Sequence, residues 1–420
     1  MDLKYFLSNI RKSFFSGNAK TIIVTICTLI LLPIIINKIG IENYGILSLS
    51  MVFGGLFGSF ELGISKTVTV LFSHSNDKEK SQIFGNAFLI ILFLLLMIGA
   101  LFVLVNANFN IFGDNKFINS DLRNFILLTS YISVGLILIN NVLLASLQGY
   151  LLNHYVDLGQ IIFSIFYHIF LIAAAFSTDS IYFIIFMPLL AYLIQAIFLS
   201  YILFSKTKLK FGKINNSSIK SMIYTSIDYF KIGLTTIFLQ PINKYLLFYL
   251  TGSAGMLGLF DVALKLANIS ASLLNASSQP LLAIFSKMKS NVGKIDSLST
   301  KVSIFIFVQY VIGLLVFLIV GKSIVGFLVS ENKQLLYHIS FLLIAAIAST
   351  AIFEPFFKYL LSLSPPKYAF YSKLSFPVSN LLFFMTINHS NILLKITYAY
   401  SMALIVNNIF TYFFYRKSVS

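Results

Sequence analysis

The chain has 420 residues, of which 58% are hydrophobic and only 10% are charged, and its formal net charge is +16 at pH 7. A soluble domain carries about a quarter charged residues, so this composition excludes a soluble globular protein and predicts a polytopic membrane protein built from helices. The positive charge then indicates lysine-rich cytoplasmic loops, and we expect no nucleic acid as a partner.

A basic amphipathic helix and a first group of spans open the chain. Residues 1–17 place Leu3, Phe6 and Ile10 at helical spacing with basic residues on other faces, which predicts an interfacial helix on the inner membrane surface. Apolar stretches of about 20 residues then recur over 18–204, and each predicts a transmembrane helix. We expect an N-terminal six-helix lobe at 18–204.

A basic loop at 205–228 divides the chain almost in half, and a C-terminal six-helix lobe is expected at 229–414, with a cytoplasmic tail at 415–420. The stretches "KIGIENYGILSL" and "YLTGSAGMLGLF" are alike in their glycines and each leads straight into a predicted helix, which indicates two six-helix repeats. The expected fold class is therefore all-α, with about twelve transmembrane helices in two bundles.

The lysines and arginines predict the orientation. If the N-terminus lies inside, most of them fall in inner loops and at inner helix ends, so both termini are expected in the cytoplasm. The predicted outer loops are short, and "GKS" at 321–323 is no phosphate-binding loop because Val316 stands where that motif needs glycine. We expect no enzyme activity, and any energy that the protein uses should come from an ion gradient or a substrate gradient.

The single cysteine, Cys27, excludes a disulfide within these residues, and the five histidines show no ligand spacing. No metal and no cofactor are therefore expected.

Polar residues form a stripe along the predicted span 256–280. They recur every three or four residues, which places them on one helix face: Asp261, Lys265, Asn268, Ser272, Asn275 and Gln279. A shorter stripe in the span 229–251 contains Gln240, Asn243 and Lys244. Two interpretations stay open. The stripes join helices by hydrogen bonds, with Asp261 neutralising Lys265 one turn away, or they line a water-filled cavity.

Two further carboxylates lie inside predicted spans. Glu61 precedes Lys66 in the span 45–67, and Glu354 precedes Pro355 in the span 337–361. Both carboxylates are candidates for binding a proton or a cation, and the alternative is a charge paired to a neighbouring helix. A cavity that holds lysines suits an anionic cargo, because an ammonium group binds phosphate.

Several stretches resemble O-antigen and polysaccharide flippases of the Wzx type, in the multidrug/oligosaccharidyl-lipid/polysaccharide exporter superfamily. They are "KIGIENYGILSL", "ELGISK", "QPINKYLLFYLTGSAGMLGLFDVALKL" and "SSQPLLAIFS", and the resemblance spans essentially the whole chain. It implies a V-shaped transporter with a central cationic cavity. Residues 61–64 match the family's acidic-Leu-Gly-apolar turn, and Asp261 and Lys265 match its charged eighth helix. The family's arginine after this turn is missing, and only Lys66 stands nearby.

The resemblance implies alternating-access transport of undecaprenyl-diphosphate-linked oligosaccharide, the O-antigen repeat unit, from the cytoplasmic to the periplasmic leaflet of the bacterial inner membrane. The expected partners are this substrate, membrane lipid, a polysaccharide polymerase and a chain-length regulator, with proton or sodium coupling left open. The candidate ion-coupling residues are Glu61, Asp261 and Glu354. The candidate substrate-binding residues are Lys66, Lys244, Lys265, Asn243, Gln240, Asn268, Ser272 and Asn275.

Two alternatives stay open. One is a cation-coupled multidrug exporter of the same superfamily, against which the deep lysines argue. The other is a membrane polysaccharide polymerase, against which the short outer loops argue.

Overall fold

The chain is helical wherever the structure, a computed structural model, describes regular secondary structure. The described residues are 3–58, 61–108, 118–178, 180–237, 241–275, 278, 281, 285, 292–329, 331–362 and 367–419. No strand occurs among them, which confirms the predicted all-α class. Helices suit a membrane protein because each helix satisfies its own backbone hydrogen bonds in lipid.

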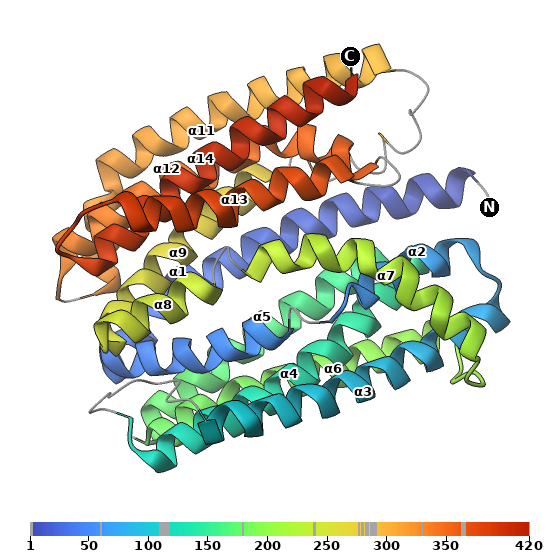
Figure 1. The fold of residues 1–420 in the computed structure, drawn as a ribbon, viewed down its shortest axis with the longest axis horizontal. Coiled ribbons are helices and arrows are strands. Elements are labelled where there is room, and N and C mark those ends of the chain that lie inside the picture. Colours follow the sequence, from blue (N-terminus) through green and yellow to red (C-terminus); the bar gives the residue numbers. More distant parts are fainter. Residues whose placement is uncertain are drawn as a thin grey trace. The chain divides into compact units, whose positions relative to one another are not determined.

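The chain divides into two compact units (Figure 1). Unit 1 comprises Met1–Ile39 and Ile46–Ile237, and unit 2 comprises Gly40–Gly45 and Phe238–Ser420. The helices that begin in unit 1 are α1 (Leu3–Gly58), α2 (Ile64–His74), α3 (Asp77–Asn108), α4 (Ser120–Gly149), α5 (Asn153–Ser177), α6 (Ile181–Lys206) and α7 (Asn216–Ile237). Those of unit 2 are α8 (Pro241–Thr251), α9 (Ala254–Asn275), α11 (Val292–Leu328), α12 (Lys333–Ser362), α13 (Lys367–Thr386) and α14 (Ile392–Val419).

A break at Gly40 interrupts α1 between the first two predicted spans. Gly40 has φ 81° and ψ 157°, a conformation that is open to glycine because it has no Cβ. The short segment Gly40–Gly45 then belongs to unit 2, while the helix before it and the helix after it belong to unit 1.

Nine helices among the described residues are long and apolar enough to cross a membrane, where the sequence predicts about twelve spans. The difference lies in how three spans are built. The predicted span 45–67 is divided between the end of α1 and α2, and the predicted span 229–251 between α7 and α8. The span expected at 370–387 corresponds to α13, whose tyrosines, serines and lysines make it less apolar. Every predicted span therefore has a helical counterpart, and the chain is a multi-pass membrane protein.

The predicted connecting loop at 205–228 differs from the structure over half its length. Residues from Asn216 onward form α7, which continues to Ile237 within unit 1. Met222 and Ile232 of α7 are buried, so an apolar face holds this partly polar helix in the unit. The predicted N-terminal helix at 1–17 is continuous with the first span in α1.

Hydrogen bonds between helices supplement apolar packing in each unit. In unit 2, Ser372 of α13 bonds to Thr411 of α14 at 2.6 Å, and the hydroxyl of Tyr310 in α11 donates to the carbonyl of Ala345 in α12 at 2.9 Å. In unit 1, the hydroxyl of Ser226 in α7 donates to that of Thr67 in α2 at 2.9 Å. Such bonds each stabilise a membrane bundle by about 0.6 kcal/mol.

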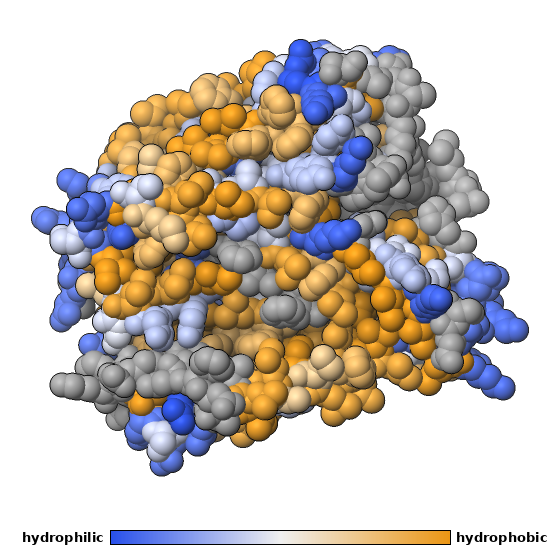
Figure 2. Space-filling model, viewed as in Figure 1, coloured by the Kyte–Doolittle hydropathy of each residue, from blue (hydrophilic) through white to orange (hydrophobic). Residues whose placement is uncertain are grey.

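Exposed apolar side chains cover the flanks of the helices. Figure 2 shows hydrophobic residues along the middle of the helices and hydrophilic residues gathered towards helix ends. Within α11, Ile304, Ile312 and Ile319 are all more than half exposed. A soluble protein rarely exposes such a surface, so these faces are suited to lipid.

Candidate functional site

A tight turn between α1 and α2 places the first candidate residues. Leu62 and Gly63 both have positive φ, 55° and 70°, and the amide of Ile64 donates to the carbonyl of Glu61 at 3.1 Å. A Cβ on Gly63 would lie 2.7 Å from the Cβ of Tyr229 in α7. Glycine is therefore required here both by the backbone conformation and by the close approach of α7.

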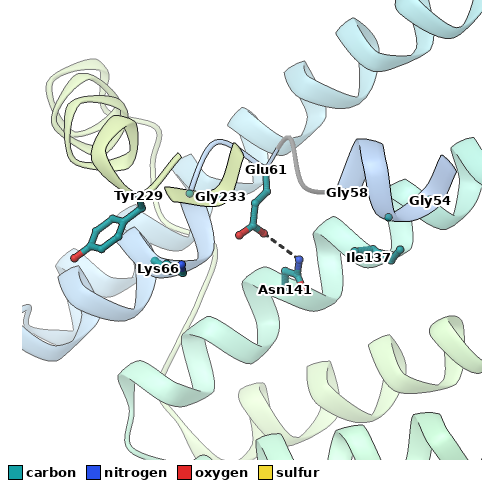
Figure 3. A pocket seen from close by; sticks show the side chains of 10 residues that line it. Gly54, Gly58, Glu61, Lys66, Ile137, Asn141, Tyr229 and Gly233 are labelled. Carbon is teal, nitrogen blue, oxygen red and sulfur yellow. Dashed lines mark hydrogen bonds between the residues drawn. The ribbon is translucent and has the colours of Figure 1, made fainter. Parts of the chain in front are cut away.

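The carboxylate of Glu61 is held by two donors within unit 1. The hydroxyl of Ser65 donates to Oε2 at 2.5 Å, and Nδ2 of Asn141 in α4 donates to the same oxygen at 3.0 Å. Figure 3 shows Glu61 and Asn141 directed at one another from the turn and from α4. The side chain is half-buried, so a carboxylate is fixed in place yet remains accessible.

Glu61 and Lys66 line one pocket of about 290 Å³ in unit 1 (Figure 3). The pocket is walled by small residues together with a few polar side chains: Gly54, Gly55, Gly58, Glu61, Gly63, Lys66, Ile137, Asn141, Tyr229 and Gly233. The sequence predicts a coupling role for Glu61 and a substrate role for Lys66, and the structure brings both to the same pocket. Its volume is near the lower limit for small-molecule sites, about 300 Å³.

The groups in this pocket suit a polar ligand. A carboxylate accepts hydrogen bonds, an ammonium group donates them, and an amide and a phenol do both. The glycines bring backbone atoms close to the space without filling it. Such a lining fits hydroxyl groups or a phosphate, and because it carries one negative and one positive side chain it does not select strongly for a net cation.

A second cluster of charges lies in unit 2, around Asp261 of α9. Asp261 and Tyr44 are buried, with exposed fractions of 3% and 1%. The hydroxyl of Tyr44 donates to Oδ2 of Asp261 at 2.5 Å, and Nζ of Lys244 in α8 pairs with Oδ1. Nζ of Lys265 lies 3.4 Å from Oδ2 and donates to the hydroxyl of Tyr44 at 2.5 Å.

This cluster joins three segments of unit 2 through one carboxylate. Two of the three predicted substrate-binding lysines, Lys244 and Lys265, direct their ammonium groups at Asp261 and its partner Tyr44. The backbones also pack closely here, since a Cβ on Gly45 would overlap the carbonyl oxygen of Ala254. Of the two interpretations of the polar stripes, this arrangement matches the one in which Asp261 neutralises a lysine. The side chains of Asp261, Lys244 and Lys265 are 5%, 15% and 27% exposed.

The rest of the polar stripe on α9 is half-buried. The hydroxyl of Ser272 donates to the carbonyl of Ile269 at 2.8 Å, and Oδ1 of Asn275 has no hydrogen-bond partner. Asn268 is half-buried as well. On α8, Oδ1 of Asn243 accepts from Nδ2 of Asn380 in α13 at 3.0 Å. Gln240 and Gln279 lie outside the described residues.

Glu354 lies on α12 of unit 2 and belongs neither to the residues that line the Glu61 pocket nor to the Asp261 cluster. Its Oε1 is 3.3 Å from Nζ of Lys358 one turn later, and the two side chains are 24% and 22% exposed. This pair lies within α12 itself, whereas the alternative that the sequence left open for Glu354 is a charge paired to a neighbouring helix. Within the described part of the chain, no three His, Cys, Asp or Glu side chains lie together as a metal site requires.

Some residues of these sites escape sequence reasoning. Asn141 and Tyr229 line the pocket, and Tyr44 completes the Asp261 cluster. Asp157 of α5 is another buried carboxylate, 3.1 Å from Nζ of Lys20 and bonded to the hydroxyl of Ser16 at 2.6 Å. In the sequence, Asn141 and Asp157 could have been recognised as polar side chains inside or at the edge of a predicted span.

The comparisons with known proteins agree with this description. Residues 10–289 match the sequence profile of a family described as polysaccharide biosynthesis proteins. No curated protein matches the chain in sequence.

Solved structures share the fold at low sequence identity. An inward-facing multidrug resistance MATE family transporter of the MOP superfamily superposes with a TM-score of 0.71 and 11% identity, over 97% of this chain and 98% of that chain. The lipid II flippase MurJ, in an inward closed conformation, gives a TM-score of 0.68 and 13% identity, over 97% and 87% of the two chains. An outward-facing MATE transporter gives 0.66 and 12%, over 98% and 95%.

Proposed function

Because the chain belongs to the polysaccharide biosynthesis protein family and has the fold of MATE transporters and the MurJ flippase, we propose that it is a lipid-linked oligosaccharide flippase. Its cargo is an O-antigen repeat unit on undecaprenyl diphosphate. The protein moves the head group from the cytoplasmic to the periplasmic leaflet of a bacterial inner membrane by alternating access, and both termini lie in the cytoplasm.

The pocket around Glu61 and Lys66 carries this proposal. It provides a fixed carboxylate, a cation, an amide and a phenol within a unit of largely apolar helices. Polar groups inside a membrane span are costly, so they are expected where a polar cargo or ion passes. A saccharide has many hydroxyl groups that both donate and accept hydrogen bonds, which matches this mixed lining.

Lys66 is the cation that we assign to the diphosphate. It is exposed on α2 and lines the pocket, whereas the ammonium groups of Lys244 and Lys265 are bonded within the Asp261 cluster. An ammonium group binds a phosphate as a point charge. Lys244 and Lys265 then hold α8, α9 and the segment Gly40–Gly45 together and contribute to transport by fixing unit 2.

Glu61 is the residue that we propose for ion coupling. Its carboxylate is held by Ser65 and Asn141 and remains accessible from the pocket, so it can exchange a proton or a sodium ion. Asp261 forms ion pairs with Lys244 and Lys265, and Glu354 forms one with Lys358. Both carboxylates are therefore less suited to ion coupling than Glu61. A polysaccharide polymerase and a chain-length regulator are the proposed partners at the periplasmic side.

The test uses a strain without this gene, in which lipid-linked repeat units are followed with a membrane-impermeant probe. The proposal predicts that repeat units accumulate on the inner face, that surface polysaccharide disappears, and that the wild-type gene restores both. If repeat units still reach the outer face but remain unpolymerised, the chain is acting in polymerisation and the proposal is wrong.

Drug export is the second candidate function, and the likeness to MATE transporters favours it. The discriminating observation is the same deletion strain. Normal surface polysaccharide together with increased sensitivity to cationic drugs would support export of drugs over transport of saccharides.

A further inference from the structure

The segment between α6 and α7 is bound along the start of α3. The amide of Gly212 donates to the carbonyl of Ser81 at 2.9 Å, and the amide of Lys210 donates to the hydroxyl of Ser81 at 3.2 Å. The amide of Asn215 donates to Oδ1 of Asn86 at 3.2 Å. Leu209 is buried at 4% exposure. This connection between the predicted lobes is therefore a fixed part of unit 1.

Close backbone packing reinforces this attachment. A Cβ on Gly212 would lie 2.5 Å from the amide nitrogen of Gln82, and one on Gly85 would lie 2.8 Å from the carbonyl oxygen of Gly212. The ring of Phe211 also lies 5.0 Å from that of Phe84 and 5.5 Å from that of Phe88, between centroids. These contacts hold the segment against α3 and define which of its side chains face outward.

The outward side is both basic and apolar. Four exposed lysines follow one another closely along it: Lys206, Lys208, Lys210 and Lys213. Between and beside them, Phe211 is 63% exposed and Ile214 is 57% exposed, although both are large apolar side chains. We call these six residues the basic loop surface.

The acidic residues nearby do not cancel this charge. Asp77 and Glu79 are exposed at the start of α3, beside Lys78 and Lys80 of the same turn. Oε2 of Glu79 accepts the amide of Asn76, so it caps the helix. Nζ of Lys80 lies over the ring of Tyr150, 4.4 Å from its centroid. The four lysines of the basic loop surface thus keep a net positive charge.

We propose that the basic loop surface binds the head groups of anionic phospholipids. The loop lies where two spanning helices end, since α3 begins at Asp77 and α6 ends at Lys206. Clusters of lysine directly beside a transmembrane helix attract anionic lipid, and the apolar side chains enter the boundary of the acyl chains. The lysine distribution assigns this end to the cytoplasmic leaflet.

The combination of features selects lipid over an acidic protein. Phe211 and Ile214 lie within a few residues of the lysines, close to the end of a helix that is long and apolar enough to cross a membrane. In an anionic phospholipid, the phosphodiester can bind the lysines while the acyl chains contact Phe211 and Ile214. This binding does not depend on which cargo the transporter carries, so it stands apart from the proposed function.

The first experiment measures lipid retained by the full-length protein. The protein is purified with equal amounts of phosphatidylglycerol and phosphatidylcholine that have the same acyl chains, and bound lipid is counted by native mass spectrometry. The loop variant replaces Lys206, Lys208, Lys210 and Lys213 with Gln. The matched control replaces four exposed lysines of unit 2 with Gln, which removes the same charge: Lys294, Lys301, Lys367 and Lys417.

Wild type and control are expected to prefer phosphatidylglycerol, and the loop variant to lose at least about tenfold of that preference. Replacing the same four lysines with Arg should retain it. An equal loss in loop variant and control would mean that total charge alone attracts the lipid, and an unchanged preference in the loop variant would mean that the loop does not bind it. Either result overturns the proposal.

A second measurement decides the matter even if the loop variant does not fold. A polarity-sensitive fluorophore is attached at Ile214→Cys in a Cys27→Ser background, and at Glu331→Cys as a water-exposed control. In vesicles containing phosphatidylglycerol, the label at position 214 is expected to shift to shorter wavelength and to resist an aqueous quencher. Emission equal to that of the control would show a loop surrounded by water and refute lipid binding.

Discussion

Replacing Gly63 with alanine should destabilise unit 1 because of two separate effects. Gly63 has φ 70°, and an alanine held in that left-handed region costs about 1–2 kcal/mol. Its Cβ would also lie 2.7 Å from the Cβ of Tyr229 and 2.8 Å from the carbonyl oxygen of Ser226, and such overpacking costs about 1–3 kcal/mol. The expected loss in the free energy of unfolding is therefore about 2–5 kcal/mol.

Gly252→Ala is the matched control for this variant. Gly252 also has positive φ, 60°, but a Cβ there would meet nothing within 4 Å. It should lose only the conformational part, about 1–2 kcal/mol.

Both variants are unfolded in detergent micelles with increasing fractions of a denaturing detergent, and the free energies are compared with wild type. Equal losses at the two positions would mean that α7 does not approach the α1–α2 turn as described. That result would refute the described pocket around Glu61, because Tyr229 and Gly233 of α7 form part of its wall.

Three further predictions concern the charged side chains. Asp261→Ala should lower the free energy of unfolding by about 3–5 kcal/mol because it removes the carboxylate that pairs with the partly buried Lys244 and Lys265. Adding Lys244→Met and Lys265→Met should recover much of that loss, and no recovery would contradict the pairing. Tyr44→Phe removes a hydroxyl bonded to both Asp261 and Lys265 and should cost about 1.5–3 kcal/mol in the same assay, with a cost near zero counting against these bonds. Glu61→Gln should retain the fold but abolish the response of transport to an imposed proton or sodium gradient, and an unchanged response would exclude Glu61 as the coupling residue.

The helical fold could be predicted from the sequence because each span must be a long apolar stretch. The interruptions were harder to predict. Leu62 adopts a positive φ although leucine carries no local signal for it, so the sequence predicts one span over 45–67 where the structure has a turn. The start of α7 at Asn216 was hidden by polar residues typical of a loop, and the buried Met222 and Ile232 pack this helix within unit 1.

The candidate sites could be predicted in part. Isolated charges in apolar spans indicate Glu61, Lys66, Asp261 and Lys265 directly. Their partners could not be found in this way, because the partners are distant in sequence. Tyr44 lies 217 residues from Asp261, and Asn141 lies 80 residues from Glu61. Whether a lysine meets a carboxylate or a cavity is decided by the fold, which periodicity along one helix does not specify.

The central claim is tested most directly by reconstituting the purified protein into vesicles with a diphosphate-linked oligosaccharide lipid. The fraction of head groups that becomes accessible to an impermeant reagent is followed over time for wild type, Lys66→Gln and the control Lys333→Gln, which changes an exposed lysine at the start of α12. The account predicts that wild type and Lys333→Gln move the lipid across the bilayer, while Lys66→Gln slows it at least about tenfold, equivalent to about 1.4 kcal/mol. Absence of movement with wild-type protein, or equal rates for all three proteins, would contradict it.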